Sequence, residues 1–269
     1  LAEAETPTYG VSTGFGALAT KHIPEDMRAQ LQVSLVRSHA AGSGPEVEEE
    51  VVRALMLLRL STLCTGRTGV RPVVVETYAA VLNAHITPVV REYGSLGCSG
   101  DLAPLAHCAL ALLGEGEVRV NGELKDAGDA LAAAGIEPLQ LREKEGLALI
   151  NGTDGMLGQL CLAITDLRAA AKTADIATAM TVEGLLGTLV VFADDLQQLR
   201  PHPGQADAAA NILQVAEGSE ILEAALEDAV RADRLLVALD FDGTLAELNP
   251  DPYAVRIHPG AERAIRRLA

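Results

Sequence analysis

The stretch most informative about chemistry is GSLGCSGDLAPL, at 94–105, which carries the hydroxyl of Ser99 between Cys98 and Gly100. The spacing is not that of a nucleophile elbow, because Asp101 and not Gly stands two residues after Ser99. No His–Asp pair is identifiable as a partner for this hydroxyl, so a hydrolase triad is unsupported. Taken alone, the tripeptide Cys98-Ser99-Gly100, named the CSG turn below, is compatible with a plain flexible turn ahead of a helix.

A second candidate site lies in DFDGT, at 240–244, directly after the apolar run LLVALD (235–240). Such a run is typical of a buried parallel strand. Residues i and i+2 at a strand end point the same way, so Asp240 and Asp242 would lie on the same side of that strand end and form a pair of carboxylates. The alternative is an ordinary Gly-containing turn after a strand.

The elements that must position the CSG turn are predicted to be helices. Proline and acidic residues favour a first helical turn, and they predict helices over 24–37, 45–58 and 71–84. In the second of these, apolar residues recur at three- and four-residue spacing. Asp101 is expected to cap a fourth helix, over 101–114, which ends at a glycine.

The rest of the chain is also mostly helical in pattern. EVRVNGELK, at 117–125, predicts a small hairpin through its Asn-Gly turn, and a strongly apolar helical block over 143–199 fits the core of a bundle or an oligomer interface. Near residue 221 the pattern changes to helix, apolar strand and helix, which is typical of α/β proteins. We therefore expect a mainly α domain over 1–221 and an incomplete α/β segment over 222–269, too short for a whole domain.

Composition excludes several classes of function. A formal net charge of −16 argues against a surface that binds nucleic acid. No secretory signal opens the chain, and no apolar run approaches the roughly 18–20 residues of a membrane span. The four cysteines lack metal-ligand spacing, and we expect reduced, mostly buried thiols of a cytoplasmic protein. Because the chain begins at Leu1 and not at Met, we also expect a fragment.

Four motifs occur in order along the chain: YGVSTGFG (9–16), RSHAAGSG (37–44), GSLGCSGDLAPLAHCAL (94–110) and REKEGLALINGTDGML (142–157). Together they resemble the first half of the histidine ammonia-lyases, within the aromatic amino-acid ammonia-lyase family, over about residues 7–221. The resemblance implies a helical-bundle lyase fold, truncated here. It also implies a homotetramer in which one active site draws residues from several subunits.

In this family an Ala-Ser-Gly or Cys-Ser-Gly tripeptide closes on itself to a methylidene-imidazolone, and the resemblance assigns that prosthetic group to the CSG turn. Gly100 has no Cβ to block its amide nitrogen from closing the ring, and loss of the Ser99 hydroxyl as water leaves an exocyclic methylene. The electrophile is needed because an α-amino group is a poor leaving group, while a positioned base takes the β-proton. The implied reaction converts the small-molecule substrate L-histidine to urocanate and ammonia.

The resemblance implies roles for three more residues. Tyr9 matches a tyrosine implicated in acid–base work, and His39 matches a position beside the substrate side chain that suits histidine or tyrosine. Asn151 matches an asparagine that hydrogen-bonds near the prosthetic group. Without the resemblance, Tyr9 is a structural residue of a Gly-rich loop, His39 a helix C-terminal residue, and Asn151 part of an Asn-Gly turn.

The chain departs from the family in its last part. A Tyr/Arg pair for the substrate carboxylate, a Phe near the prosthetic group and a late Glu do not follow. Instead, DFDGT and its flanks resemble the first motif of haloacid-dehalogenase-type phosphatases, and the flanks are similar to those of trehalose-phosphatases. That resemblance implies that Asp240 attacks phosphorus and Asp242 protonates the leaving oxygen. It also implies that these two carboxylates hold Mg²⁺, which neutralises the phosphate. The later Ser/Thr, Lys and acidic motifs of those enzymes are missing, and no Lys follows Asp242.

Three functions follow as hypotheses: an ammonia-lyase acting on L-histidine, a sugar-phosphate phosphatase using Mg²⁺, and a fusion fragment without catalysis. Ring formation at the CSG turn separates the first from the third, and magnesium-dependent phosphate release tests the second. We interpret the lyase as the function that the residues encode.

Overall fold

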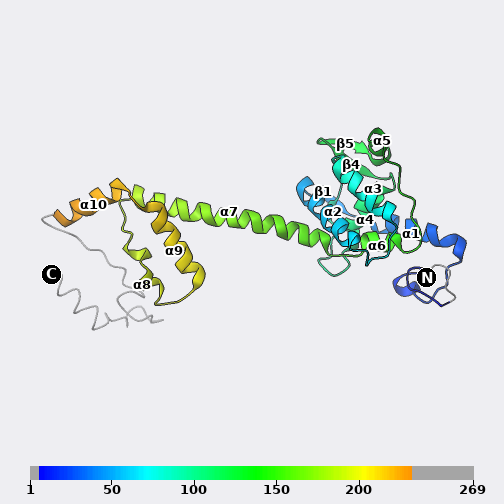
Figure 1. Ribbon diagram of the computed structural model, residues 1–269, viewed down its shortest axis with the longest axis horizontal. Helices are drawn as coiled ribbons and strands as arrows, with labels where there is room; N and C mark the ends of the chain where they lie inside the picture. Colours follow the sequence, from blue (N-terminus) through cyan, green and yellow to red (C-terminus); the bar gives the residue numbers. More distant parts are fainter. Residues whose placement is uncertain (1–5, 232–269) are drawn as a thin grey trace. The chain divides into compact units, whose positions relative to one another are not determined.

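The structure, a computed structural model, describes residues 6–231 of the chain. Contacts divide the chain into two units, Leu1–Ala169 and Ala170–Ala269, called unit 1 and unit 2 below (Figure 1). The boundary predicted near residue 221 marks a change of sequence pattern and stays a prediction.

Unit 1 is built mainly from helices. They are η1 (Gly16–Leu18), α1 (Glu25–His39), α2 (Glu49–Cys64), α3 (Pro72–Asn83), α4 (Leu102–Leu112), α5 (Ala127–Ala133) and α6 (Glu145–Ile150). The helices predicted over 24–37, 71–84 and 101–114 are confirmed. The helix predicted from residue 45 begins later, at Glu49, because the preceding Ser43–Glu46 forms a strand instead.

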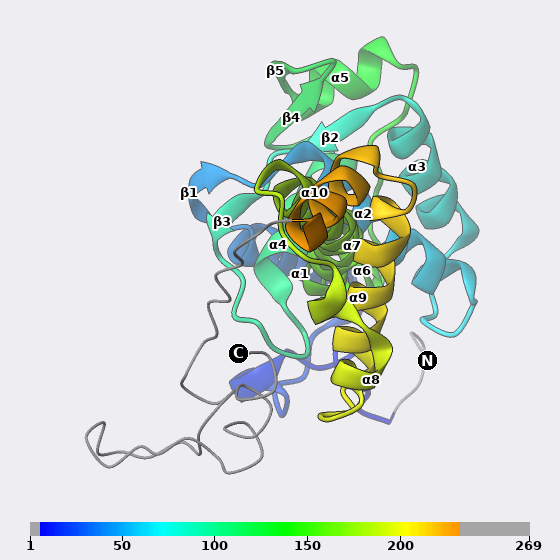
Figure 2. The same ribbon diagram turned by 90° about the vertical axis from the view of Figure 1, so that its left-hand side faces the viewer.

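Five short strands in the described part of unit 1 form two sheets. β1 (Ser43–Glu46) pairs antiparallel with β3 (Arg91–Tyr93). The second sheet has the antiparallel order β2 (Ile86–Pro88), β4 (Glu117–Val120) and β5 (Glu123–Asp126), with α5 beside β4 and β5 (Figure 2). The predicted hairpin is confirmed. Its turn residues Asn121 and Gly122 have φ angles of +52° and +82°, as a type I′ turn requires.

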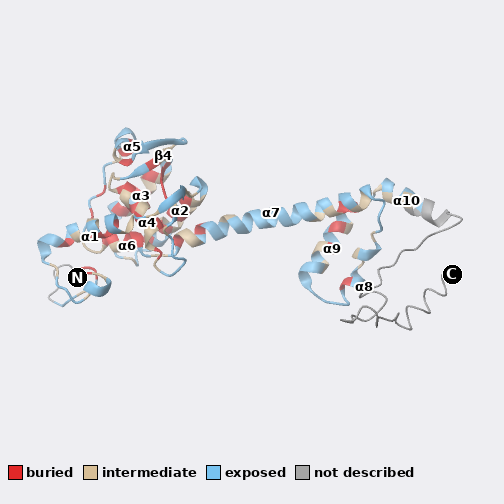
Figure 3. Ribbon diagram, turned by 180° about the vertical axis from the view of Figure 1, so that it is seen from behind, coloured by how far each residue is buried: buried red, intermediate tan, exposed pale blue. Residues whose placement is uncertain are grey.

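The core of unit 1 holds α1, α4 and α6 against one another. The sequence of α4 is apolar nearly all round, which predicts a buried helix, and its Leu105, Cys108 and Leu112 are at most 1 % exposed. Buried residues of α4 and α6 belong to one continuous cluster with those of α2 and α3, seen in red in Figure 3. This packing gives the segments at the ends of α1, α4 and α6 a rigid support.

The apolar block predicted over 143–199 is not one helix. It breaks after α6, at residues 151–153, and continues as α7 (Asp154–Gly184). Helix η2 (Val190–Phe192) and the short α8 (Asp194–Gln197) fill the rest of it. The break coincides with Asn151-Gly152, a dipeptide that favours turns.

Unit 2 is helical in its described part. It contains the later residues of α7, then η2, α8, α9 (Pro203–Ala216) and α10 (Glu220–Arg231). A small apolar cluster is centred on Ala179, Ile212 and Ala216. Hydrogen bonds from Asn211 to Asp175 (2.8 Å) and from Ser219 to Glu183 (2.5 Å) tie α7 to the segment that follows it. The described residues of unit 2 include none of the candidate site residues.

The stretch Glu145–Gly184 contains 18 successive residues with a mean hydropathy of 1.3, and it is long and apolar enough, by length and composition alone, to cross a membrane. The expectation that no apolar run approaches the length of a membrane span is wrong by that measure. Part of the stretch is core of unit 1. Along α7, however, Leu157, Leu160 and Ile164 lie at three- and four-residue spacing and are 44 %, 53 % and 40 % exposed. Within the described residues of unit 1, this apolar face of α7 is therefore uncovered, as the pale blue of Figure 3 shows.

Candidate active site around residues 98–100

The CSG turn lies on an exposed, strongly bent segment directly before α4. Cys98 and Ser99 are exposed, and the chain bends at each residue from 97 to 100. Gly97 and Gly100 flank the pair with φ angles of +61° and +78°, in the left-handed region that favours glycine. The segment is therefore curled on itself, as closure of a five-membered ring would need.

Asp101 anchors the base of this turn. It is 2 % exposed, and its carboxylate accepts hydrogen bonds from the Ser95 hydroxyl and from the backbone N–H of Leu96 (2.8 Å). The residue occupies the N-cap position of α4, but its side chain makes no capping bond to the helix. The predicted position of Asp101 at the start of the helix is thus right, but the predicted capping hydrogen bond is wrong, because the carboxylate binds the preceding loop instead.

Asn151 lies against the CSG turn. Its Oδ1 faces Gly100 so closely that a methyl group on the α-carbon of Gly100 would lie 2.7 Å from it. The backbone N–H of Asp101 donates to the carbonyl of Gly152 at 2.9 Å. The turn before α4 and the turn after α6 are therefore in direct contact.

A buried ion pair that the sequence analysis did not identify supports the Asn151 turn. Arg59 of α2 and Asp154 of α7 form this pair, with side chains 5 % and 8 % exposed. Arg59 Nη1 also donates to the carbonyls of Ala148 (3.0 Å) and Asn151 (3.1 Å). A signal was present in the sequence, because Arg59 stands on the apolar face of α2, in line with Leu55 and Leu63 at four-residue spacing.

His39 is the last residue of α1. Its Nδ1 lies 2.9 Å from the carbonyl oxygen of Leu35 and 3.0 Å from the hydroxyl of Ser38. The ring is therefore held by its own helix end, which agrees with the structural alternative for this residue. Among the described residues, no hydrogen bond or ring contact joins His39 to the CSG turn.

Tyr9 lies on the Gly-rich segment before α1 and is 52 % exposed. Its hydroxyl accepts a hydrogen bond from the backbone N–H of Gly16 (3.2 Å), and its ring meets that of Phe15 edge-on at 5.9 Å. In the described part of the chain, Tyr9 makes no hydrogen bond or ring contact with the CSG turn. Its segment is nevertheless tied to α6.

That tie is Gln32, a fully buried amide on α1 that the sequence analysis also missed. Gln32 Nε2 donates to the carbonyl of Gly10 at 3.1 Å, and its Oε1 accepts from the backbone N–H of Leu147 at 3.3 Å. Leu147 lies one helical turn before Asn151. One side chain thus connects the Tyr9 segment to the helix that carries Asn151.

We expect Gln32→Leu to destabilise unit 1 by about 1–3 kcal/mol, because the Gly10 carbonyl and the Leu147 N–H lose their buried partner. Urea unfolding measures this change, and faster proteolysis within 6–23 reports the loosened Tyr9 segment. Gln30→Leu is the control, because Gln30 lies on the same helix but is exposed, and its side chain donates to the Ser34 hydroxyl (3.3 Å). Equal effects of the two substitutions would contradict the prediction.

Glu145 holds the other end of α6. Its carboxylate, 2 % exposed, accepts hydrogen bonds from the Arg71 guanidinium (2.8 Å) and from the backbone N–H groups of Arg71 (3.0 Å) and Arg142 (2.8 Å). Burial opposes its charge, yet these hydrogen bonds and the positive charge of Arg71 outweigh burial, so the pKa of Glu145 lies below its ordinary value.

A lowered folded-state pKa makes a contribution to stability that is complete above the unfolded-state pKa of about 4.3. This contribution is lost as the pH falls through the lower folded value. We therefore expect the free energy of unfolding to decrease from about pH 5 downwards, and Glu145→Gln to flatten that decrease. Urea unfolding at several pH values is the measurement, with the exposed Glu137→Gln as control. An unchanged pH dependence in Glu145→Gln would show that another carboxylate is responsible.

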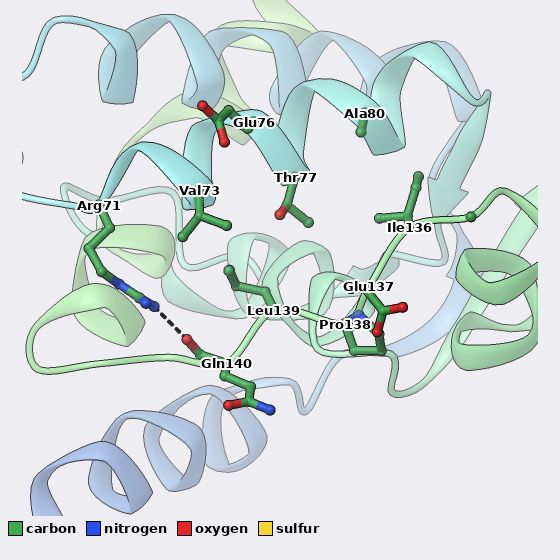
Figure 4. A pocket seen from close by; sticks show the side chains of 11 residues that line it. Arg71, Val73, Glu76, Thr77, Ala80, Ile136, Glu137, Pro138, Leu139 and Gln140 are labelled. Carbon is green, nitrogen blue, oxygen red and sulfur yellow. Dashed lines mark hydrogen bonds between the residues drawn. The ribbon is translucent and has the colours of Figure 1, made fainter.

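A groove of about 520 Å³ opens near this ion pair, between α3 and the segment 135–140. Arg71 borders it and donates to the carbonyl of Gln140 at 2.5 Å (Figure 4). Two carboxylates, Glu76 and Glu137, also line it. None of the sequence-predicted site residues does, so the groove is separate from the candidate site.

Two further predictions need correction or fall outside the structure. All four cysteines are free, as expected, but only Cys108 is buried, where burial raises its pKa to about 12; the other three are exposed. Asp240 and Asp242 lie outside the described residues. Within residues 6–231, no group of three or more His, Cys, Asp or Glu side chains could hold a metal ion.

The sequence matches the aromatic amino acid lyase family over residues 1–266. It is 62 % identical over 232 residues to a histidine ammonia-lyase of Streptomyces avermitilis, covering 86 % of this chain and 45 % of that protein. A histidine ammonia-lyase of Sorangium cellulosum is 49 % identical over 222 residues, covering 82 % and 43 %. The chain spans about half the length of the relatives it matches.

Solved structures agree with these relatives. Tyrosine aminomutase from Streptomyces globisporus superposes with a TM-score of 0.76 at 40 % identity, covering 89 % of this chain and 46 % of that one. Histidine ammonia-lyase from Trypanosoma cruzi superposes with a TM-score of 0.71 at 37 % identity, covering 82 % and 43 %. The mainly helical lyase fold is thus confirmed, for about half of such a structure.

The lyase match runs through most of 222–269, where the sequence analysis predicted a phosphatase-like segment, and the comparisons lend no support to that segment or to Mg²⁺. The match over 1–266 and the shared helical fold lead to one conclusion: this chain is a homologue of histidine ammonia-lyase and belongs to the aromatic amino acid lyase family.

Proposed function

We propose that unit 1 carries the electrophile-forming part of an ammonia-lyase site, and that the CSG turn closes to a methylidene-imidazolone. The observation that carries this proposal is the contact between Gly100, at a φ of +78°, and Asn151. A curled Cys-Ser-Gly segment with an amide group against its glycine fits the prosthetic group.

Ring closure uses only atoms of the chain. The amide nitrogen of Gly100 attacks the carbonyl carbon of Cys98, and the carbonyl oxygen leaves as water with the N–H hydrogens of Gly100 and Ser99. Ser99 then loses its hydroxyl and its α-hydrogen as a second water. The hydrogen bonds to Asp101 hold the loop before the turn, so attacking and attacked atoms stay near each other.

Once formed, the group supplies an electrophile that makes the substrate's α-amino group a better leaving group. The 11-residue helix α4 begins directly after the turn, and the positive end of its dipole favours negative charge there. Asn151 would hydrogen-bond to the ring. By the motifs, Tyr9 would exchange the proton of the reaction and His39 would lie beside the substrate's side chain.

The substrate follows from the relatives and from His39. The histidine ammonia-lyases that match this chain support L-histidine, which would give urocanate and ammonia. Since the chain spans about half of those proteins, the remaining active-site groups and the homotetramer would come from sequence and subunits beyond it. The uncovered apolar face of α7 supports association.

The intact mass of the purified chain, compared with Ser99→Ala, tests the proposal. For the chain without substitutions, we expect a measured mass that is lower by two water molecules than the mass calculated from its sequence. For Ser99→Ala, we expect the calculated mass. A urocanate assay with L-histidine, with L-tyrosine as the competing substrate, then tests turnover. If the chain without substitutions shows the full calculated mass, ring formation is contradicted and the fragment without catalysis is favoured.

The phosphatase alternative rests on Asp240 and Asp242 alone, and no observation in the described residues favours it.

A further inference from the structure

We propose that Arg59 is a positioning residue for ring closure: through the backbone of the turn after α6, it holds Asn151 against Gly100. This inference rests on the proposed function. Arg59 is separated in sequence from both segments, and its side-chain hydrogen bonds in the described residues go to the turn after α6 and not to the CSG turn. We therefore expect it to act on the ring through that turn, which carries Asn151.

The guanidinium binds three groups of that turn. Nη1 donates to the carbonyls of Ala148, in the last turn of α6, and of Asn151, just after it. Nη2 pairs with Asp154, the first residue of α7. Arg59 therefore connects the end of one helix to the start of the next and leaves the intervening residues little freedom.

Gly152 shows how closely the turn fits this cation. A methyl group on its α-carbon would overlap Arg59 Nη2 and the Asp154 carboxylate. On the other side, the Gly152 carbonyl accepts the backbone N–H of Asp101 at 2.9 Å. The turn is thus held between Arg59 and the base of the CSG turn, and its Asn151 side chain faces Gly100.

The energetics favour a positioning role over a purely stabilising one. A buried ion pair contributes little net stability compared with a well-packed apolar pair. Arg59 Nε is moreover buried without a hydrogen-bond partner among the described residues, which lowers that contribution further. What the pair does provide is a fixed direction, because a planar guanidinium binds several acceptors in one geometry and a lysine ammonium does not.

The experiment measures ring closure in the 269-residue chain by intact mass at intervals after synthesis. We expect Arg59→Lys to lose its two water molecules about 10- to 100-fold more slowly, as small misplacements of reacting groups do. Arg53→Lys is the matched control. It lies on the same helix and donates to Leu82 (3.2 Å), away from the turn. An unchanged rate in Arg59→Lys would overturn the inference.

A double-mutant cycle separates positioning from general damage. If Arg59 acts through Asn151, Arg59→Lys slows closure no further in an Asn151→Ala background, whereas a merely structural role would slow both backgrounds equally and would overturn the inference. Should Arg59→Lys fold poorly, the pair Arg59→Met with Asp154→Leu removes both charges and leaves neither unpaired. We expect that double variant to fold and to close the ring as slowly as Arg59→Lys. A folded double variant that closes the ring at the normal rate would overturn the inference.

Failure of the proposed function gives a different result. If the chain without substitutions shows no loss of water by mass, ring formation is contradicted. Hydrogen exchange at the backbone amides of Asn151 and Asp101 then tests the positioning role of Arg59. Faster exchange there in Arg59→Lys, but not in Arg53→Lys, supports the positioning contacts. Unchanged exchange overturns them.

Discussion

Under the proposed function, we expect Gly100→Ala to slow ring closure in the CSG turn, seen as water loss, by about 100-fold or more. The new methyl group would lie 2.7 Å from Asn151 Oδ1, so the turn or the asparagine must move. Alanine is also strained at the φ of +78° that residue 100 adopts. Intact mass over time is the measurement.

Gly97→Ala is the matched control, because it lies in the same turn. Its φ is +61°, so it shares the backbone strain, but a methyl group there meets nothing within 4 Å. We expect Gly97→Ala to slow closure far less than Gly100→Ala. Equal slowing would mean that backbone strain, and not the contact with Asn151, decides the rate.

Asp154→Ala destabilises unit 1 by about 3–5 kcal/mol, because it leaves the Arg59 guanidinium buried without its counter-charge. Both side chains of this pair are less than 10 % exposed, so water screens them little. The free energy of unfolding in urea measures the loss.

Asp166→Ala is the control for this change, since Asp166 is an exposed carboxylate on the same helix. It should alter stability by no more than about 0.5 kcal/mol. The paired variant Arg59→Met with Asp154→Leu should recover most of the lost stability. A loss below about 1 kcal/mol in Asp154→Ala would show that water reaches Arg59.

Local sequence signals correctly predicted the elements whose starts or turns depend on neighbouring residues. Prolines and acidic residues marked the starts of α1 and α3, and Asn121-Gly122 marked the hairpin. The Pro45 signal failed, because pairing of Ser43–Glu46 with β3 outweighs a local preference. The apolar pattern over 143–199 gave no indication that the helix breaks at Asn151, although the Asn-Gly dipeptide at that position favours a turn.

The candidate site was predicted only in part. Motifs named the CSG turn and Asn151, and these two are in contact. The polar residues that support them were missed, because their partners are far away in sequence: Arg59 and Asp154 are 95 residues apart, and Gln32 and Leu147 are 115. Such contacts depend on how helices pack, which a single sequence does not encode in any local pattern.

Helix α6 has six residues, far fewer than the roughly 12–15 that an isolated helix needs in water. It therefore depends on contacts from outside the helix, which Gln32, Arg71 and Arg59 supply. Asn151 directly follows this helix, so its position against Gly100 depends on the same contacts. Under the proposed function, the loss of two water molecules would mark each chain that had reached the folded state. Because this change is covalent, mass measurement would still detect it after the chain is denatured.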